Sequence, residues 1–203
     1  MAGRTYKELK NDSYGFIRIA KEVTYRYANT QKEYSQSEVA EEFNLSESCV
    51  RKLMDYAIIN SLVPRITAQK VMNKSIENQQ RKHPEAGGTS ITHHQKLIRE
   101  REENIAQKMN KERIKFIVES AVALERNQPY SDLVKVLNLE SMKVLQFIFE
   151  RAIVENIASE NEAMHLINRS LLKNNSKEIR DYFDELVRKR QEFRKSLDKK
   201  DSG

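Results

Sequence analysis

A short run around residue 48 carries side chains suited to recognising the edges of nucleic-acid bases. Ser48, Arg51 and Lys52 are spaced by three and four residues, so a helix would place them on one face. A guanidinium on that face can donate two hydrogen bonds to guanine, and a hydroxyl can serve several bases. The pattern therefore indicates hydrogen-bonded recognition, with an ordinary solvated helix face as the alternative.

The residues around this run have the spacing of a helix-turn-helix. Counting from Gln36, Ala40 stands where the two helices must touch, and Asn44 tolerates the left-handed conformation of a tight turn. Ser46 can cap the second helix. We predict a helix-turn-helix whose second helix spans 46–59, with an ordinary helical hairpin as the alternative. The positions expected to face its core are apolar: Leu45, Val50 and Leu53.

In such a motif the second helix meets base edges in the major groove, and neighbouring polar groups bind phosphates. The candidate DNA-binding residues of this half are Gln36, Ser37, Ser46, Glu47, Ser48, Arg51, Lys52, His93 and Lys96. Residues 34–63 nevertheless carry a net charge of −3. Phosphate attraction supplies much of the affinity for DNA, so positive charge must come from other segments, or the motif does not bind DNA.

The chain also contains an internal repeat. Residues 57–75 align without a gap to 152–170, and 38–46 align to 132–140 with a shift one residue smaller. The second copy therefore has one extra residue in its turn. Its second helix, 142–154, is so apolar that protein contacts are an alternative to base reading. The candidate DNA-binding residues of this copy are Ser141, Met142, Lys143 and Gln146.

We expect an all-α protein with two related helix-turn-helix units of three to four helices. The expected domains are an N-terminal unit (1–88), a charged helical linker (89–111), a second unit (112–175) and an amphipathic C-terminal helix (176–203). Gly87-Gly88 is expected to break the chain before Thr89 or Ser90 caps the linker helix.

An apolar stripe runs along the C-terminal helix. It can dock on the body of the protein or form a two-stranded coiled coil in a homodimer. The stripe consists of Ile179, Tyr182, Leu186, Phe193 and Leu197.

The first half resembles the stage III sporulation protein D family of small bacterial helix-turn-helix transcription regulators. The resemblance rests on residues 39–54, 71–83 and 85–97, including the glycine pair. It implies that the segment after the glycines, with His93, His94 and Lys96, helps to grip DNA. This segment has histidines where the family resemblance implies lysines, and the chain adds a second unit and a tail.

Composition narrows the function classes. The 203 residues carry a net charge of +6, which permits binding to nucleic acid, and the single cysteine, Cys49, forms no intramolecular disulfide. We expect Cys49 to lie near DNA, as a small side chain in the second helix. The sequence has no signal-peptide pattern and no apolar run long enough to span a membrane, so we expect a cytoplasmic protein.

The histidines lack metal-ligand spacing, and no nucleophile lies in a cluster that would activate it. We therefore expect no enzyme activity, no cofactor and no metal. The expected partner is double-stranded DNA, read by a transcription regulator of a bacterium or a mobile element. Two alternatives stay open: a protein-interaction module that uses helix-turn-helix folds as scaffolds, and a nonspecific architectural DNA binder of a phage or plasmid.

Overall fold

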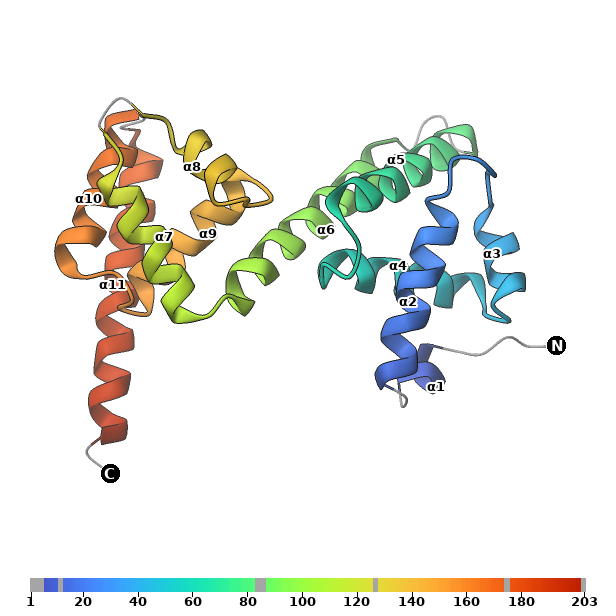
Figure 1. Cartoon of the computed structure of the whole chain (residues 1–203), viewed down its shortest axis with the longest axis horizontal. Helices are drawn as coiled ribbons and strands as arrows, with labels where there is room; N and C mark the ends of the chain where they lie inside the picture. Colours follow the sequence, from blue (N-terminus) through green and yellow to red (C-terminus); the bar gives the residue numbers. More distant parts are fainter. Residues whose placement is uncertain (1–5, 11–12, 83–86, 126–127, 174–175, 202–203) are drawn as a thin grey trace. The chain divides into compact units, whose positions relative to one another are not determined.

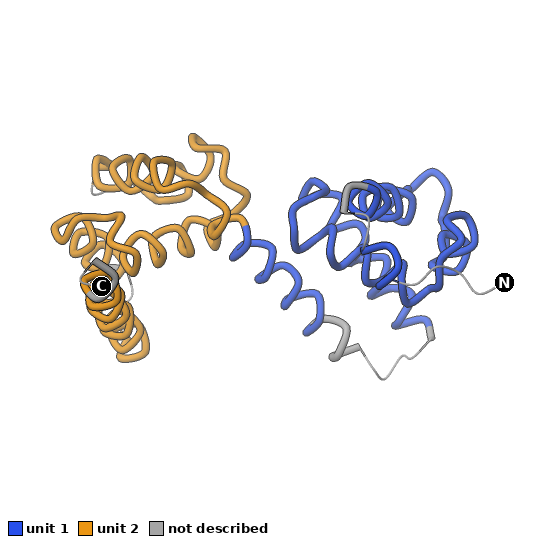
Figure 2. Tube along the Cα trace, turned by 90° about the horizontal axis from the view of Figure 1, so that it is seen from below, with its two compact units in different colours: residues 1–104 blue, residues 105–203 orange. Residues whose placement is uncertain are grey.

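The computed structural model describes residues 6–10, 13–82, 87–125, 128–173 and 176–201. All regular structure in these residues is helical, which confirms the predicted all-α class (Figure 1). No described helix is both long and apolar enough to cross a membrane. The chain divides into two compact units, residues 1–104 and 105–203 (Figure 2).

Unit 1 is built around one apolar core to which all of its helices contribute. α2 crosses α4 at the centre of the unit (Figure 1). Val23 and Leu53, one from each of these helices, are fully buried. The helices are α1 (Tyr6–Lys10), α2 (Ser13–Tyr27), α3 (Gln36–Glu42), α4 (Glu47–Ile59), α5 (Arg65–Lys82) and α6 (Gly87–Lys108).

Two helical segments of unit 1 differ from the sequence expectation. α1 was not predicted; it buries Leu9 in the core and places Tyr6 edge-on to Phe16, with ring centroids 5.2 Å apart. α6 begins at Gly87, so the glycine pair lies in its first turn instead of ahead of a helix capped by Thr89 or Ser90. Glycine destabilises the middle of a helix, and a position in the first turn is outside that interior.

The predicted linker is not a separate segment. The unit boundary falls at 104/105, within the 89–111 segment. Leu97 is buried in the first core and Ala106 in the second, because apolar residues recur along α6 between its charged ones. α6 ends at Lys108, and Asn110 caps α7 by accepting from the Arg113 N–H at 2.8 Å.

Unit 2 has its own apolar core. In this unit the C-terminal helix packs chiefly on the helix that corresponds to α4 in the repeat. The helices are α7 (Lys111–Ala123), α8 (Tyr130–Val136), α9 (Met142–Val154), α10 (Glu160–Lys173) and α11 (Lys177–Asp201).

The stripe on α11 contributes to this core through its first half. Leu186 is buried, and Tyr182 packs against the core residues. Ile179 and Phe193 are half-buried, whereas Leu197 is 42% exposed. Docking on the body therefore accounts for the N-terminal part of the stripe, and a homodimer through its C-terminal part stays a prediction.

Candidate nucleic-acid interface

The N-terminus of α3 is fixed by a reciprocal pair of hydrogen bonds. The Ser35 hydroxyl accepts from the Glu38 N–H at 3.1 Å, and the Glu38 carboxylate accepts from the Ser35 N–H at 2.6 Å. These bonds satisfy backbone donors that a helix start leaves open, and they lower the pKa of Glu38. Gln36 then links α3 to α4 by donating its side-chain amide to the Glu47 carbonyl at 2.7 Å.

The turn between α3 and α4 has the geometry that the sequence predicts. Asn44 has φ of 52°, and the Leu45 N–H donates to the Ala40 carbonyl at 2.8 Å. This bond, with that from the Asn44 N–H to the Glu41 carbonyl, closes a Schellman motif at the end of α3. The Ser46 hydroxyl accepts from the Cys49 N–H at 3.2 Å and caps α4.

The inward faces of the two helices also follow the sequence prediction, with one exception. Ala40, Val50 and Leu53 are buried. Cys49 is only 2% exposed and belongs to the core, so the expectation that it lies near DNA is wrong. Its position, one residue before Val50, puts it on the inner side of α4 because the inner face of this helix is wider than a single stripe.

The outward face carries most of the predicted contact residues. Ser37, Ser46, Glu47, Ser48, Arg51 and Lys52 are all exposed. Gln36 is half-buried, and its amide nitrogen is already used within the unit. The cap and the N-terminal half of α4 therefore present two hydroxyls, a guanidinium and an ammonium beside the Glu47 carboxylate.

Three of the acidic residues that give this segment its negative charge are engaged within unit 1. Glu38 caps α3, Glu42 pairs with Arg26 at 2.6 Å, and Asp55 pairs with His93 at 3.5 Å. Asp55 is half-buried, and burial raises the pKa of its carboxyl although His93 and Arg51 oppose that rise. The Arg26 guanidinium thus offsets one of these acidic charges, and the other two carboxylates accept hydrogen bonds or face a histidine.

The predicted contacts on α6 are not free basic groups. His93 faces Asp55, and Lys96 lies 3.7 Å from Glu100 in an exposed ion pair. His94 is 9% exposed, and burial lowers the pKa of its imidazole, with a further contribution from His93. Of these three residues, His94 is a core side chain and only His93 and Lys96 reach the surface.

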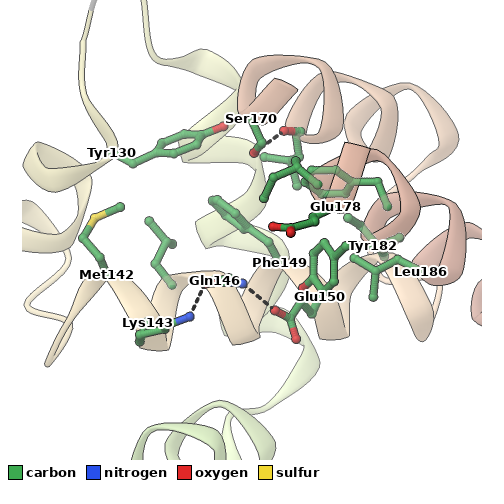
Figure 3. A pocket seen from close by; sticks show the side chains of 15 residues that line it. Tyr130, Met142, Lys143, Gln146, Phe149, Glu150, Ser170, Glu178, Tyr182 and Leu186 are labelled. Carbon is green, nitrogen blue, oxygen red and sulfur yellow. Dashed lines mark hydrogen bonds between the residues drawn. The ribbon is translucent and has the colours of Figure 1, made fainter. Parts of the chain in front are cut away.

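In unit 2 the corresponding face has a different character. Ser141 caps α9 by accepting from the Val144 N–H at 3.2 Å, as Ser46 caps α4. Met142, Lys143 and Gln146 are exposed, but they border an apolar pocket between α9, α10 and α11 (Figure 3). Lys143 donates to Gln146, and Gln146 donates to Glu150, both at 3.0 Å. The four predicted residues of this unit therefore do not form a basic reading face.

Sequence reasoning missed two buried arginines that occupy matching places. Arg101 of α6 donates to the carbonyls of Ile58 and Val63 at 2.9 and 3.0 Å. Arg190 of α11 donates to those of Ile153 and Ala158 at 2.9 and 2.8 Å. In the repeat, Ile153 and Ala158 are the counterparts of Ile58 and Val63.

A sequence signal for these arginines exists. Residues 97–101 (LIRER) and 186–190 (LVRKR) share a leucine, a branched residue and two arginines at the same spacing. Their shift of 89 differs from that of the rest of the repeat, so an alignment at a constant shift does not find them. They make α11 the counterpart of α6 and extend the repeat into the last helix of each unit.

A second basic residue recurs at equivalent positions of the two units. Lys74 donates to the Tyr27 carbonyl at 3.1 Å and lies 4.8 Å from the centroid of the Tyr27 ring. Arg169, its counterpart, donates to the Leu124 carbonyl at 3.1 Å and lies 4.7 Å from the Tyr130 ring. Both cations bind the carbonyl end of the first long helix of their unit, where the helix dipole favours positive charge.

No protein-family model, no curated protein and no solved structure matches this chain.

Proposed function

We propose that the protein binds double-stranded DNA in a sequence-specific manner and acts as a transcription regulator of a bacterium or a mobile element. The observation that carries the proposal is the outward face of α4. Its N-terminal half exposes Ser48, Arg51 and Lys52, while a Schellman turn at Asn44 and the cap at Ser46 fix its start. A helix held in this way can place its first turns in a major groove.

The exposed groups suggest separate roles. The Arg51 guanidinium is suited to a bidentate contact with guanine, and the Ser48 hydroxyl to a less selective base contact. Lys52 and the hydroxyls of Ser37 and Ser46 are suited to phosphates, which position a protein without reading sequence. The resemblance to the stage III sporulation protein D family supports the same use of this helix.

A protein-interaction role is the second candidate function. It is favoured by the net charge of −3 on residues 34–63, which the Arg26 guanidinium offsets only in part. A helix-turn-helix fold does not by itself imply DNA binding, because the same fold can serve as a scaffold.

The test is selection of bound sites from a random duplex DNA pool at moderate salt, with the whole chain. The wild type is run beside Arg51→Ala/Lys52→Ala and beside a control, Lys111→Ala/Lys115→Ala. Both double variants lower the net charge from +6 to +4. The control changes exposed lysines on α7 and leaves α4 intact.

We expect an enriched motif for the wild type and the control, and loss of that motif for the α4 variant. Each lost base contact should cost about 1–3 kcal/mol. Salt-dependent binding without an enriched motif would point to a nonspecific architectural binder. Absence of binding, or a motif that survives in the α4 variant, would overturn reading by α4 and direct attention to a protein partner.

A further inference from the structure

Unit 2 contains a pocket that the proposed DNA contacts do not use. Its volume is about 550 Å³, within the range of sites that hold drug-sized molecules. α9 forms one wall, α11 the opposite wall, and Tyr130 of α8 and Leu166 and Ser170 of α10 line the remainder (Figure 3).

The pocket is lined mainly by apolar and aromatic side chains. Met142, Leu145 and Phe149 lie along α9, and Ile179 and Tyr182 lie along α11. Met142 is 47% exposed, which leaves a large thioether at the edge of the pocket open to solvent. An apolar molecule placed here would remove this surface from water.

The charged groups of the lining favour a cation. Among the described lining residues, Glu150 and Glu178 contribute two carboxylates and Lys143 contributes one cation. The ammonium of Lys143 is engaged by the side-chain oxygen of Gln146. Glu178 and Tyr182, both on α11, line this part of the pocket (Figure 3).

The repeat shows how this surface differs from that of unit 1. Arg51 of α4 corresponds to Gln146 of α9, and His93 of α6 corresponds to Tyr182 of α11. Two groups that can carry positive charge are thus replaced by neutral ones, whereas the acidic position is kept as Asp55 and Glu150. A phosphate at this place would meet two carboxylates, and an organic cation would be attracted by them.

We propose that this pocket is a binding site for a bulky lipophilic organic cation. The apolar walls take the body of the molecule. Glu150, Glu178 and the ring face of Tyr182 stabilise its positive charge. This site lies entirely within unit 2 and does not depend on DNA binding by α4.

The experiment is isothermal titration calorimetry of the whole chain, without DNA, with two probes of nearly the same shape and opposite charge. Tetraphenylphosphonium is the cation and tetraphenylborate the anion. We expect the cation to bind and the anion to bind at least about tenfold more weakly, because one favourable charge contact of about 1.4 kcal/mol is tenfold in affinity.

Three charge variants locate the site. Glu178→Gln should weaken binding of the cation about tenfold, and Lys143→Gln should strengthen it, since each removes one charge from the lining. Asp184→Asn is the matched control: it removes an exposed carboxylate from the same helix outside the lining, and it should leave the affinity unchanged. Glu178 and Lys143 are exposed, so neither change disturbs the core.

A fourth variant, Met142→Trp, fills the mouth of the pocket at an exposed position and should reduce binding of the cation strongly. The proposal is overturned if the cation does not bind, or if the anion binds as tightly as the cation. It is equally overturned if the cation binds but Glu178→Gln, Lys143→Gln and Met142→Trp all leave its affinity unchanged, because the bound molecule then lies elsewhere.

Discussion

His94 of α6 is a titratable side chain that is buried in unit 1. Its imidazole packs in the core region of unit 1, and the ring atom Nδ1 has no hydrogen-bond partner among the described residues. Phe183 stands at the corresponding position of α11, where the lining is apolar as well. The repeat therefore suggests that a neutral ring suits this position and that the charged imidazolium does not.

Burial lowers the pKa of His94, which gives unit 1 a definite response to acid. Below about pH 6.5, the usual pKa of histidine, the unfolded chain binds the proton more readily than the native one. The free energy of unfolding should therefore fall as the pH drops from about 6.5 through the lowered native pKa. His94→Phe should remove this contribution and stabilise unit 1 by about 1 kcal/mol near pH 6.

Urea unfolding monitored by hydrogen exchange of the α4 and α6 amides, at several pH values between 5.5 and 8, measures the effect. His165→Gln on the exposed side of α10 is the control and should keep the acid response. An unchanged acid response in His94→Phe would show that His94 is not its source.

Ser61 is a second residue whose conformation has an energetic cost. Its φ of 55° lies in the left-handed region, where the three matching turn positions of the chain have asparagine: Asn44, Asn138 and Asn156. Residues other than glycine and asparagine adopt this conformation at a cost of roughly 1 kcal/mol. Serine here follows α4 and closes a Schellman motif through the Leu62 N–H, 2.9 Å from the Ala57 carbonyl.

Ser61→Asn should stabilise unit 1 by about 0.5 kcal/mol, and Ser61→Gly by up to about 1 kcal/mol. The free energy of unfolding in urea measures both changes. The reverse substitution, Asn138→Ser, alters an exposed residue with the same backbone conformation in unit 2 and should cost a similar amount. Destabilisation by Ser61→Gly would show that the hydroxyl, and not the backbone, determines this position.

At the scale of the elements, the last helix of each unit is held by a buried arginine. Arg101 is 1% exposed and binds two carbonyls at and beyond the C-terminal end of α4, where backbone acceptors lack helical partners. Arg190 does the same at the end of α9. Each arginine thus links α6 or α11 to the helix on which the candidate sites lie.

Arg101→Gln should destabilise unit 1 by about 2–4 kcal/mol, because it removes a buried guanidinium that donates to the carbonyls of Ile58 and Val63. Residue-resolved hydrogen exchange should show loss of protection at the end of α4 and along α6, with unit 2 unaffected. Arg190→Gln is the matched variant and should give the mirror result at α9 and α11. Equal loss of protection in both units from either change would contradict separate closure of the two cores.

Part of the structure of the individual helices and turns could be predicted from the sequence. Local signals predicted the α3–α4 turn, the cap at Ser46 and the inward positions Val50 and Leu53, and the structure confirms these features. Each depends on a few neighbouring residues and on backbone geometry, which composition and spacing record directly. The interpretation of both units as helix-turn-helix units stays a prediction, and so do the DNA contacts themselves.

Other features escaped prediction because they depend on contacts between distant residues. The short α1 is too brief for a periodic pattern, and its Leu9 is buried only because α2 and α4 cover it. Cys49 was expected near DNA because it lies in the second helix of the motif, yet packing places it in the core. The pocket of unit 2 joins residues of α8, α9, α10 and α11, so no single segment indicates it.

At the scale of the whole molecule, the repeat gives two cores with the same internal order of helices. α2 to α6 in unit 1 correspond to α7 to α11 in unit 2. The turn asparagines, the serine caps and the buried arginines recur at equivalent places. The outward faces differ most, since α4 exposes Arg51 and Lys52 where α9 has Gln146 and Phe147.

The buried arginines affect how far the sequences of the two units can diverge. They bind backbone carbonyl oxygens, a group that every amino acid carries. These hydrogen bonds therefore do not depend on which side chains occupy α4 or α9. A substitution on those helices can change what the surface recognises while the closure of the core persists. A substitution that would unfold an interface made of paired side chains is thus tolerated here. One unit of the repeat can therefore acquire a new binding specificity through single substitutions.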